Sequence, residues 1–389
     1  MKRYIFLTIV LSLLIASACS TNNSEESFPT SALQTWATNS NTDVTEDSNE
    51  FKIVMTPIDE NGVIRFCGNL NEKVYVDTVV NIPEGNMVRV LDVQVVSYDI
   101  ENIKQILFPE GKAVVEFSEP GYTLLRESLN NRLCSHVDYV NSSQVLYSCR
   151  TEQMYEIMGL LFNSDKSSSL YNLGAFSQDI ELSFLTREEA IAQVKKTVSQ
   201  FHIESDFTTT IFTIDHETLS QIENKYMNDG FHQEFSFKGS WELSDDRYYI
   251  VLEQVIHGLP VYSDHIDTGS FSYEGCAIEA MITRDGYETL SIKNQYIVSG
   301  VNSDPRAILS AEDIIHKVGN KFDSIISNSS FYINSMELKY LPEFKDSSMV
   351  SIQLIPVWCV NVTETVETGE IVNTISRDYL MDAFTGYKY

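Results

Sequence analysis

The sequence predicts an α+β protein, with a β-rich N-terminal unit followed by two units that each combine a helix with an antiparallel sheet. Strand-like runs of alternating or β-branched residues recur along most of the chain. Two amphipathic helices begin with similar capping sequences, at Thr186 and at Ser310, and strand-like segments follow each of them. We therefore expect a first unit over 51–184, a second over 185–300 and a third over 301–389.

The N-terminus of the chain has the parts of a secretory signal. Two basic residues precede an apolar run over 4–15, and small residues at 16–18 lead to Cys19. The run is shorter than the ~20 residues that cross a bilayer. A cysteine at this place is typical of bacterial lipoproteins, in which the thiol receives a diacylglycerol and becomes the new N-terminus. We predict a lipoprotein signal peptide over 1–19 with lipidation at Cys19. An ordinary signal peptide with an incidental cysteine is the alternative.

The segment over 20–50 is polar and acidic and contains no Lys or Arg. It lacks the apolar residues that would let it bury surface, so we expect a disordered stalk between the membrane and the body. The whole chain carries 27 basic and 55 acidic residues, a formal charge of −28. This charge argues against nucleic acid and against direct adhesion to anionic lipid, because both require surfaces rich in Lys and Arg.

The β-rich unit contains several strand patterns and two predicted helices. Strands are expected at 64–66, 73–80, 87–97 and 113–117. A short helix over 100–107 follows Asp99, whose side chain can cap the free N–H groups of the first turn. A second helix is expected at 152–162, and no periodic pattern defines the topology between residues 122 and 183.

Each of the later two units opens with a capping box. Glu189 follows Thr186 by three residues, so each side chain can accept a hydrogen bond from the other residue's backbone N–H. The same arrangement begins at Ser310, and apolar residues with helical spacing follow both boxes. Strands are then expected at 210–214, 233–243, 248–256, 277–282 and 288–298, and at 331–341, 350–363 and 374–382.

Turn residues separate the strands of the second unit. Gly258 and Pro260, in the run HGLPV, suit a turn between two paired strands. Asp285 followed by Gly286 suits a hairpin turn. We expect these residues to shape the backbone and to have no part in chemistry.

The third unit has its own set of structural residues. Trp358 stands two residues after Pro356 and is expected to pack the sheet against the helix that begins after Ser310. Asp382 and Gly386 are expected to shape the closing turn.

These two sets of residues are similar to those of PepSY and fungalysin-propeptide modules, which have a strand, an nGlPV run, a second strand and a dG turn. The C-terminal set also resembles the L-x-Y … PvW … vDA-x-tG pattern of YycI/YycH-like extracytoplasmic proteins. The chain resembles a family of uncharacterised Firmicutes lipoproteins with such repeats, loosely over 60–389 and best over 185–389. The resemblance implies two PepSY-like units and a regulatory or inhibitory binding function. The chain departs from YycI/YycH-like proteins in having a lipid anchor instead of a transmembrane helix.

Besides Cys19, the chain has five cysteines: Cys67, Cys134, Cys149, Cys276 and Cys359. None forms a CxxC pair, so zinc clusters and thioredoxin-type motifs are unsupported. Outside the cytoplasm a disulfide is permitted, and Cys134 and Cys149 are the best candidates because they are close in sequence and flank a polar turn. The alternative, two free thiols, stays open. Cys359 lies in an apolar strand and is expected to be a buried thiol.

The sequence contains no catalytic motif. HExxH, GxSxG, Walker A, GxGxxG and EF-hand patterns are all missing. His257 and His265 lie near acidic residues and could hold a transition metal, although a polar turn is the simpler interpretation. Asp245 and Asp246 lie where a hairpin turn is expected, so we expect both in solvent. The sequence therefore predicts no catalytic residue, no metal site and no cofactor.

The predicted function is binding at the extracytoplasmic face of the cell membrane. We expect a lipid-anchored, non-catalytic protein that binds or regulates an envelope protein partner, through a sheet face that its helices leave open to a strand or peptide. The alternative is a lipoprotein that binds a small molecule or peptide for an uptake system. Part of the 20 Tyr and 20 Phe could form an exposed aromatic strip for a peptide or glycan.

Overall fold

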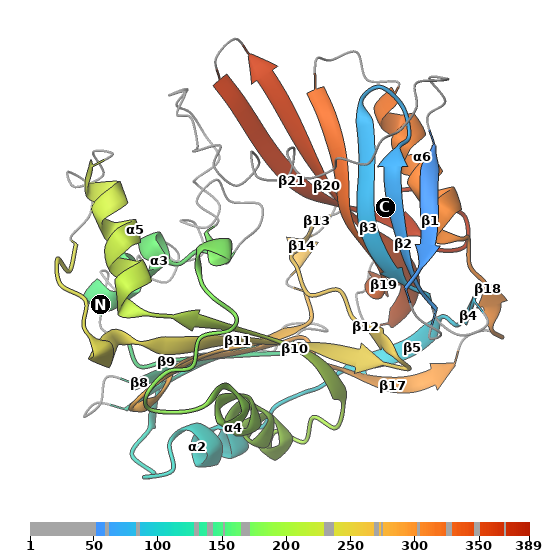
Figure 1. Ribbon diagram of the computed structural model, residues 1–389. Coiled ribbons are helices and arrows are strands. Elements are labelled where there is room, and N and C mark those ends of the chain that lie inside the picture. Colours follow the sequence, from blue (N-terminus) through green and yellow to red (C-terminus); the bar gives the residue numbers. More distant parts are fainter. Residues whose placement is uncertain are drawn as a thin grey trace.

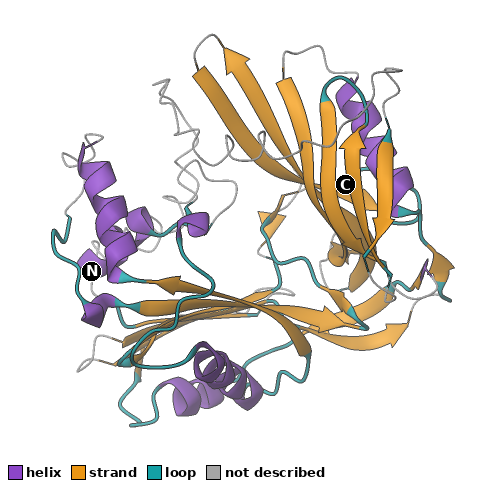
Figure 2. Cartoon of the chain, in the orientation of Figure 1, coloured by secondary structure: helices purple, strands orange, loops and turns teal. Residues whose placement is uncertain are grey.

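The computed structural model describes residues 52–58, 62–82, 86–127, 132–137, 143–150, 152–164, 172–228, 237–267, 272–273, 275–301, 304–323, 329–345, 351–368 and 371–389. Cys19, the predicted leader and the predicted stalk lie outside these residues. Two large sheets dominate the molecule, one upright and one lying below it in Figure 1. Figure 2 shows the helices packed on these sheets.

The first sheet has eight strands in the order β1-β2-β3-β19-β20-β5-β17, with β21 beside β20. These strands are β1 (Ile53–Pro57), β2 (Val63–Asn69), β3 (Val74–Asn81), β5 (Leu91–Val95), β17 (Tyr296–Val301), β19 (Ser329–Phe344), β20 (Ile352–Thr368) and β21 (Ile371–Asp382). The pair β3–β19 is parallel, and the other pairs are antiparallel. A small ladder of β4 (Met87–Val88) and β18 (Arg306–Ala307) lies apart from both large sheets.

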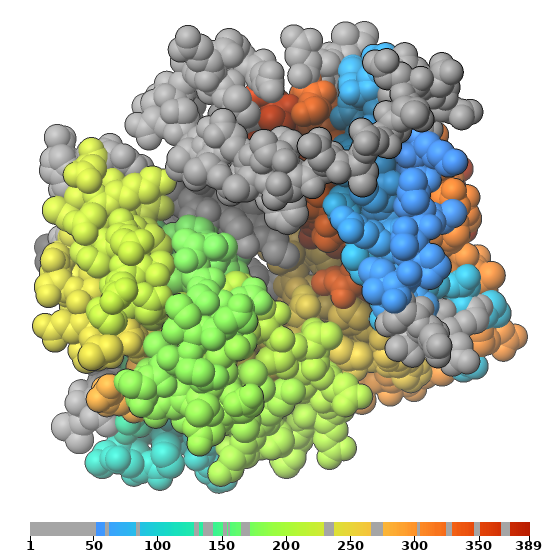
Figure 3. Space-filling model, in the orientation of Figure 1, coloured from blue at the N-terminus to red at the C-terminus, as the bar shows by residue number. Residues whose placement is uncertain are grey.

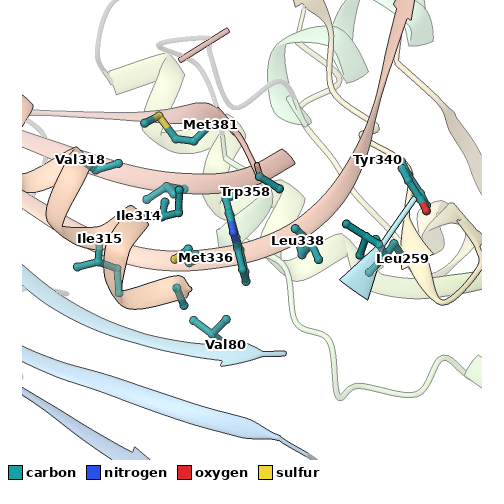
Figure 4. Packing of buried hydrophobic residues seen from close by; sticks show 14 of the residues in the cluster. Val80, Leu259, Ile314, Ile315, Val318, Met336, Leu338, Tyr340, Trp358 and Met381 are labelled. Carbon is teal, nitrogen blue, oxygen red and sulfur yellow. The ribbon is translucent and has the colours of Figure 1, made fainter. Parts of the chain in front are cut away.

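One face of the first sheet is covered by α6 (Ala311–Asp323). The strands alternate as a half-covered sheet requires: in β3, Val76, Thr78 and Val80 are buried, whereas Asp77 and Val79 point the other way. Trp358 is fully buried beneath α6, close to Ile314 (Figure 4), and its indole N–H donates to the carbonyl of Leu309 over 3.2 Å. This side of the sheet is therefore an apolar core.

The second sheet has nine strands in the order β10-β11-β15-β16-β9-β8-β7-β6, with β12 beside β11. They are β6 (Val114–Glu119), β7 (Tyr122–Glu127), β8 (Arg132–Val137), β9 (Gln144–Ser148), β10 (Asp206–Ile214), β11 (Arg247–Ile256), β12 (Leu259–Pro260), β15 (Ala277–Thr283) and β16 (Gly286–Lys293). All of its pairs are antiparallel. A short ladder of β13 (Ile266–Asp267) and β14 (Ser272–Tyr273) lies between the two large sheets (Figure 1).

Helices cover both faces of the second sheet. The helix α4 (Arg187–Gln200) packs on the face that carries Tyr248, with α2 (Ile100–Leu107) beside it. The other face carries Tyr249 and is covered at one end by α3 (Glu152–Leu161) and α5 (His216–Asn228). Figure 1 shows these two pairs of helices on opposite sides of the sheet.

The predicted helix caps are confirmed. Asp99 accepts from the N–H of Asn102 at the start of α2. Thr186 and Glu189 form the complete capping box of α4. At α6, the hydroxyl of Ser310 accepts from the N–H of Asp313 over 3.1 Å, and the Asp313 carboxylate accepts from the backbone N–H of Ser310. These helices begin where the sequence predicts because capping depends on residues close together in the chain.

The predicted fold class, a β-rich unit followed by two PepSY-like units in tandem, is wrong. The first sheet combines β1–β3 and β5, from the start of the chain, with β19–β21 from its end. The second sheet combines β6–β9 with the strands that follow α4. Each sheet thus takes strands from both sides of the expected boundaries, and neither is a self-contained helix-plus-sheet repeat. Local patterns identify a strand but leave its partners open, and here β3 pairs with β19 from the far end of the chain.

Candidate functional site

The two sheets meet at a seam where the chain passes from one to the other. After the turn at Gly258 and the short strand β12, the chain leaves the second sheet, and Val261 forms a parallel bridge with Tyr340 of β19. The N–H of Tyr262 then donates to the carbonyl of Tyr340 over 2.8 Å. Side chains from both sheets gather beside this crossing, on the face of the first sheet that points away from α6. We call the following residues the seam site: Glu253, Tyr262, Ser263, Asp264, Glu337, Lys339, Cys359 and Asp378.

Lys339 and Glu253 join the two sheets at the centre of the seam site. The Lys339 ammonium lies 3.3 Å from Glu253 Oε1 on β11 and 3.1 Å from Glu337 Oε2 on its own strand. Ser263 donates to the same Glu253 oxygen. Burial alone would lower the pKa of Lys339, but the two carboxylates outweigh burial and raise the pKa above its usual value. Lys339 is therefore a fixed positive charge and not a nucleophile.

Cys359 and Tyr262 form the buried floor of the seam site, with Leu341, Ile355 and Val357 around them. Burial, and then the nearby Asp378, raises the pKa of the Cys359 thiol well above its usual value. Burial and the same carboxylate also raise the pKa of Tyr262. Both groups stay protonated at neutral pH, so the seam site holds neither a thiolate nor a phenolate.

The seam site carries more negative than positive charge. The charge of Asp264 adds to the effect of burial in raising the pKa values of Tyr249, Tyr262 and Cys359. Asp378 accepts from the Asn361 amide over 2.6 Å. The seam site as defined thus contains four carboxylates, those of Glu253, Asp264, Glu337 and Asp378, and one ammonium, that of Lys339, which pairs with Glu253 and Glu337. Such a surface attracts cations and repels anions.

From the seam site, the same face of the first sheet continues as an open, polar surface. The rings of Tyr75 and Tyr332 stack at 5.5 Å across β3 and β19. Farther along the face, Asn334 donates to Thr363 over 2.9 Å. Figure 3 shows the molecular surface hollowed between the green segments, which pack on the second sheet, and the blue strands of the first. We call the stacked tyrosines with Asn334 and Thr363 the open face.

The sequence-predicted turn residues of the second sheet belong to neither the seam site nor the open face. His257 and Gly258 both have positive φ, of 48° and 81°, and form the two-residue hairpin between β11 and β12, with Pro260 in β12. Asp285 and Gly286 lie in the hairpin between β15 and β16. His265 is exposed, and among the residues that the structure describes no group of His, Cys, Asp and Glu has the spacing of a metal site.

The sequence-predicted residues of the C-terminal part lie in the core and in the last turn. Pro356 stands in β20 opposite Tyr340, and Trp358 packs under α6. Asp382 Oδ1 accepts from the N–H groups of Phe384 and Thr385, and Gly386 follows with φ of 71°.

The expected disulfide between Cys134 and Cys149 is not formed, and all the described cysteines are free thiols. The register of β8 and β9 places Tyr147 opposite Cys134, which is buried in the core under α2. The Cys149 thiol instead donates to the carbonyl of Tyr287 on β16. Proximity in sequence therefore did not bring the two sulfur atoms together.

Sequence reasoning was wrong about Asp245 and Asp246, which are buried and not in solvent. Asp245 forms an ion pair with Lys238, and Asp246 Oδ1 lies 2.8 Å from His216 Nδ1. Next to them, Arg247 is 3% exposed, so this charged run belongs to the interior.

Sequence reasoning also missed a buried triad of charges at the end of the second sheet. The Arg247 guanidinium donates to both carboxylate oxygens of Glu288, over 2.9 and 2.7 Å. Arg150 reaches the same carboxylate over 2.9 Å and also contacts the sulfur of Met281. Each charge has a partner and little exposure, so the triad is a structural element and offers no group to a ligand.

Comparisons with known proteins define the fold but give no function. No family model matches the chain, and no curated protein matches it. The structure is similar to the crystal structure of an uncharacterized protein from Eubacterium rectale ATCC 33656, with a TM-score of 0.66 and 16% sequence identity. The similarity covers 84% of this chain and 93% of that one. At this identity the likeness shows a shared fold and nothing about ligands.

The described residues also contain no helix long and apolar enough to span a bilayer.

Proposed function

We propose that this chain is a lipid-anchored, non-catalytic binding protein on the extracytoplasmic face of the cell membrane. Its partner would be a basic segment of an envelope protein, bound at the seam site and along the open face. The observation that carries this proposal is the seam site, where carboxylates outnumber ammonium groups and where the thiol and the amine both stay protonated. A site of this kind favours a cationic ligand and supplies no nucleophile.

The charge of the whole molecule supports the same partner. A formal charge of −28 accelerates the approach of a basic protein and slows that of an acidic one. The open face adds the stacked Tyr75 and Tyr332, which are each 37% exposed and can cover an aliphatic side-chain stem. The lipid at Cys19 would keep this surface near partners in the membrane.

Binding of short charged peptides tests the proposed site. We expect the full chain in a non-ionic detergent to bind an oligolysine peptide, to ignore oligoglutamate, and to lose affinity as salt is added. Glu337→Gln with Asp378→Asn should weaken oligolysine binding about tenfold in calorimetry, since two carboxylates near the peptide are neutralised.

A matched double variant separates the seam site from the general negative charge. Glu188 and Glu204 are exposed on the second sheet's side of the molecule, so Glu188→Gln with Glu204→Gln removes the same charge elsewhere. This control should bind oligolysine like the wild type. Equal binding by both double variants would show that the peptide senses only the net charge, and the proposed site would then be refuted.

The anchor has its own test. Cys19→Ala should abolish labelling by a radioactive fatty acid and leave the leader uncleaved. Normal processing of that variant would refute lipidation whatever the peptide experiment shows.

A second candidate function, a binding lipoprotein for an uptake system, is favoured by the hollow between the two sheets (Figure 3). A small ligand or peptide enclosed there would raise the melting temperature of the chain, by mass action on the folded state. A thermal shift with small amines or peptides, and none with a basic protein partner, would favour this candidate over the first.

A further inference from the structure

The strand β6 forms one end of the second sheet and, within the described part of the chain, pairs with β7 alone. All of its residues are exposed. Three of them are apolar: Val114, Val115 and Phe117 are 58%, 47% and 48% exposed. Soluble proteins commonly protect such an edge with charged side chains, because its free N–H and C=O groups can pair with another chain. Here apolar side chains occupy much of the edge.

A bulge organises the side chains along this edge. Val114 stands opposite Arg126 on β7, and Phe117 stands opposite Leu124, with Glu116 as the extra residue between them. Arg126 and Leu124 are two residues apart on β7, so they share a face of the sheet. The bulge therefore places Val114 and Phe117 on that same face. The Glu116 carboxylate accepts from Arg126 over 2.6 Å and is thereby tied to its own sheet.

We propose that β6 pairs antiparallel with β6 of a second copy of this chain, joining the two nine-stranded sheets edge to edge. The two-fold axis would pass between Val115 and Glu116. Val114 of each copy then stands opposite Phe117 of the other, twice in the interface. Directly opposed residues must lie on one face. Val114 and Phe117 meet this condition because both copies carry the bulge.

The same register pairs opposite charges at the ends of the interface. If the pairing continues two residues before β6, Lys112 of each copy falls opposite Glu119 of the other, and Ala113 falls opposite Ser118. In the structure Lys112 pairs with Glu110, but both side chains of this pair are at least half exposed, so the bond is weak and its partner can change. Sliding the register by two residues would place Val114 opposite Glu119 and lose both new ion pairs. The edge is thus complementary to itself, and this favours a second copy over a foreign strand.

Charge exchange across the interface tests this dimer. The full chain is purified in detergent at physiological ionic strength, where charges beyond ~8 Å are largely screened. Its mass is measured by light scattering that separates protein from detergent. We expect the wild type to be a dimer. Lys112→Glu and Glu119→Lys each place like charges opposite one another twice, so each should raise the dissociation constant of the dimer about tenfold or more.

An equal mixture of the two variants decides the register. Lys112→Glu and Glu119→Lys chains face one another with opposite charges at both ends, so the mixture should dimerise at concentrations at which each variant alone is monomeric. Lys195→Glu and Glu204→Lys make the same charge changes at exposed positions away from β6 and should leave the wild-type dimer unchanged. A monomeric wild type overturns the proposal, and so does a mixture that stays monomeric.

Discussion

The two sheets of this molecule are stabilised in different ways. The first sheet buries an apolar core under a single helix, α6, with Trp358 and the stacked Phe322 and Phe331 inside it. The second sheet has helices on both faces and places the charged triad of Arg150, Arg247 and Glu288 at its end. The second sheet thus combines apolar cores on both faces with a set of buried, matched charges at its end, whereas the core under α6 is apolar.

The difference also separates stability from function. Within the described residues, the first sheet has a helix on one face only. Its other face is buried at the floor of the seam site and continues from there with polar side chains. At the end of the second sheet, the buried charges of Arg150, Arg247 and Glu288 pair with one another. The proposed binding surface therefore lies on the sheet that α6 covers on one face.

Replacing Trp358 by Ala should cause the largest loss of stability on the side of the first sheet. The indole is fully buried between β20 and α6, so its removal leaves a cavity and breaks the hydrogen bond to Leu309. We expect the free energy of unfolding to fall by about 3–5 kcal/mol in urea denaturation. Tyr387→Ala, at a residue that is 78% exposed, should change it by less than about 0.5 kcal/mol. Similar losses in the two variants would contradict a core centred on Trp358.

Glu288→Gln should be nearly as costly for the second sheet. It removes the buried carboxylate with which both Arg150 and Arg247 pair, and we expect a loss of about 3 kcal/mol or more. Glu116→Gln is the matched control, because the Glu116–Arg126 pair is 41% and 38% exposed and should contribute less than about 1 kcal/mol.

A triple variant sharpens this test. Replacing Arg150, Arg247 and Glu288 together by Met removes all three charges, so it should cost much less than Glu288→Gln alone. If the triple variant is less stable than Glu288→Gln, the triad must stabilise the fold through interactions other than the neutralisation of buried charge.

The same comparison explains how much the sequence could predict. The starts of α2, α4 and α6 were predicted because each cap involves residues three positions apart. Trp358 was predicted to pack under the helix after Ser310 from its place beside Pro356 in the C-terminal pattern, and the structure confirms this contact.

The partition of strands between the sheets could not be predicted, since no local pattern records that β3 pairs with β19 and not with β6. The burial of the charged residues could not be predicted from the sequence for a related reason. Asp245, Asp246 and Arg247 look like a solvated turn, and their burial depends on Lys238, His216 and Glu288, which lie in other elements. The seam site was missed because Glu253 and Lys339 are 86 residues apart and neither belongs to a motif.

Two glycine variants compare turns of the two sheets, and we expect them to lose less stability than the core and triad variants. Gly386 closes the first sheet with φ of 71°, and Gly258 turns the second with φ of 81°. Alanine at either position is strained by about 1–2 kcal/mol, because a side chain disfavours positive φ. At Gly386 the new Cβ would also lie 2.5 Å from Cδ of Lys317, whereas at Gly258 nothing lies within 4 Å. We therefore expect Gly386→Ala to lower the melting temperature more than Gly258→Ala. The reverse order would contradict the close packing of Gly386 in the closing turn.

The smallest expected effect concerns a single proton at the second sheet. The hydrogen bond to Asp246 raises the pKa of His216 above its usual value of about 6.5. A raised pKa stabilises the folded chain at pH values below that of the unfolded histidine, and this contribution disappears as the pH rises through the raised value. Asp246→Asn should therefore cost more stability at acidic than at alkaline pH. The pH-dependent part should stay below about 1 kcal/mol, because His216 is partly exposed.

Nuclear magnetic resonance resolves the same effect at the ring itself. In Asp246→Asn the midpoint of the His216 titration should fall, whereas Asp285→Asn, at an exposed hairpin residue, should leave it in place. An unchanged midpoint in Asp246→Asn would mean that the carboxylate positions α5 only through the backbone N–H of His216, which donates to the same oxygen over 2.8 Å. The second sheet would then depend on this carboxylate for geometry and not for charge, and the contrast with the first sheet would be confined to the triad.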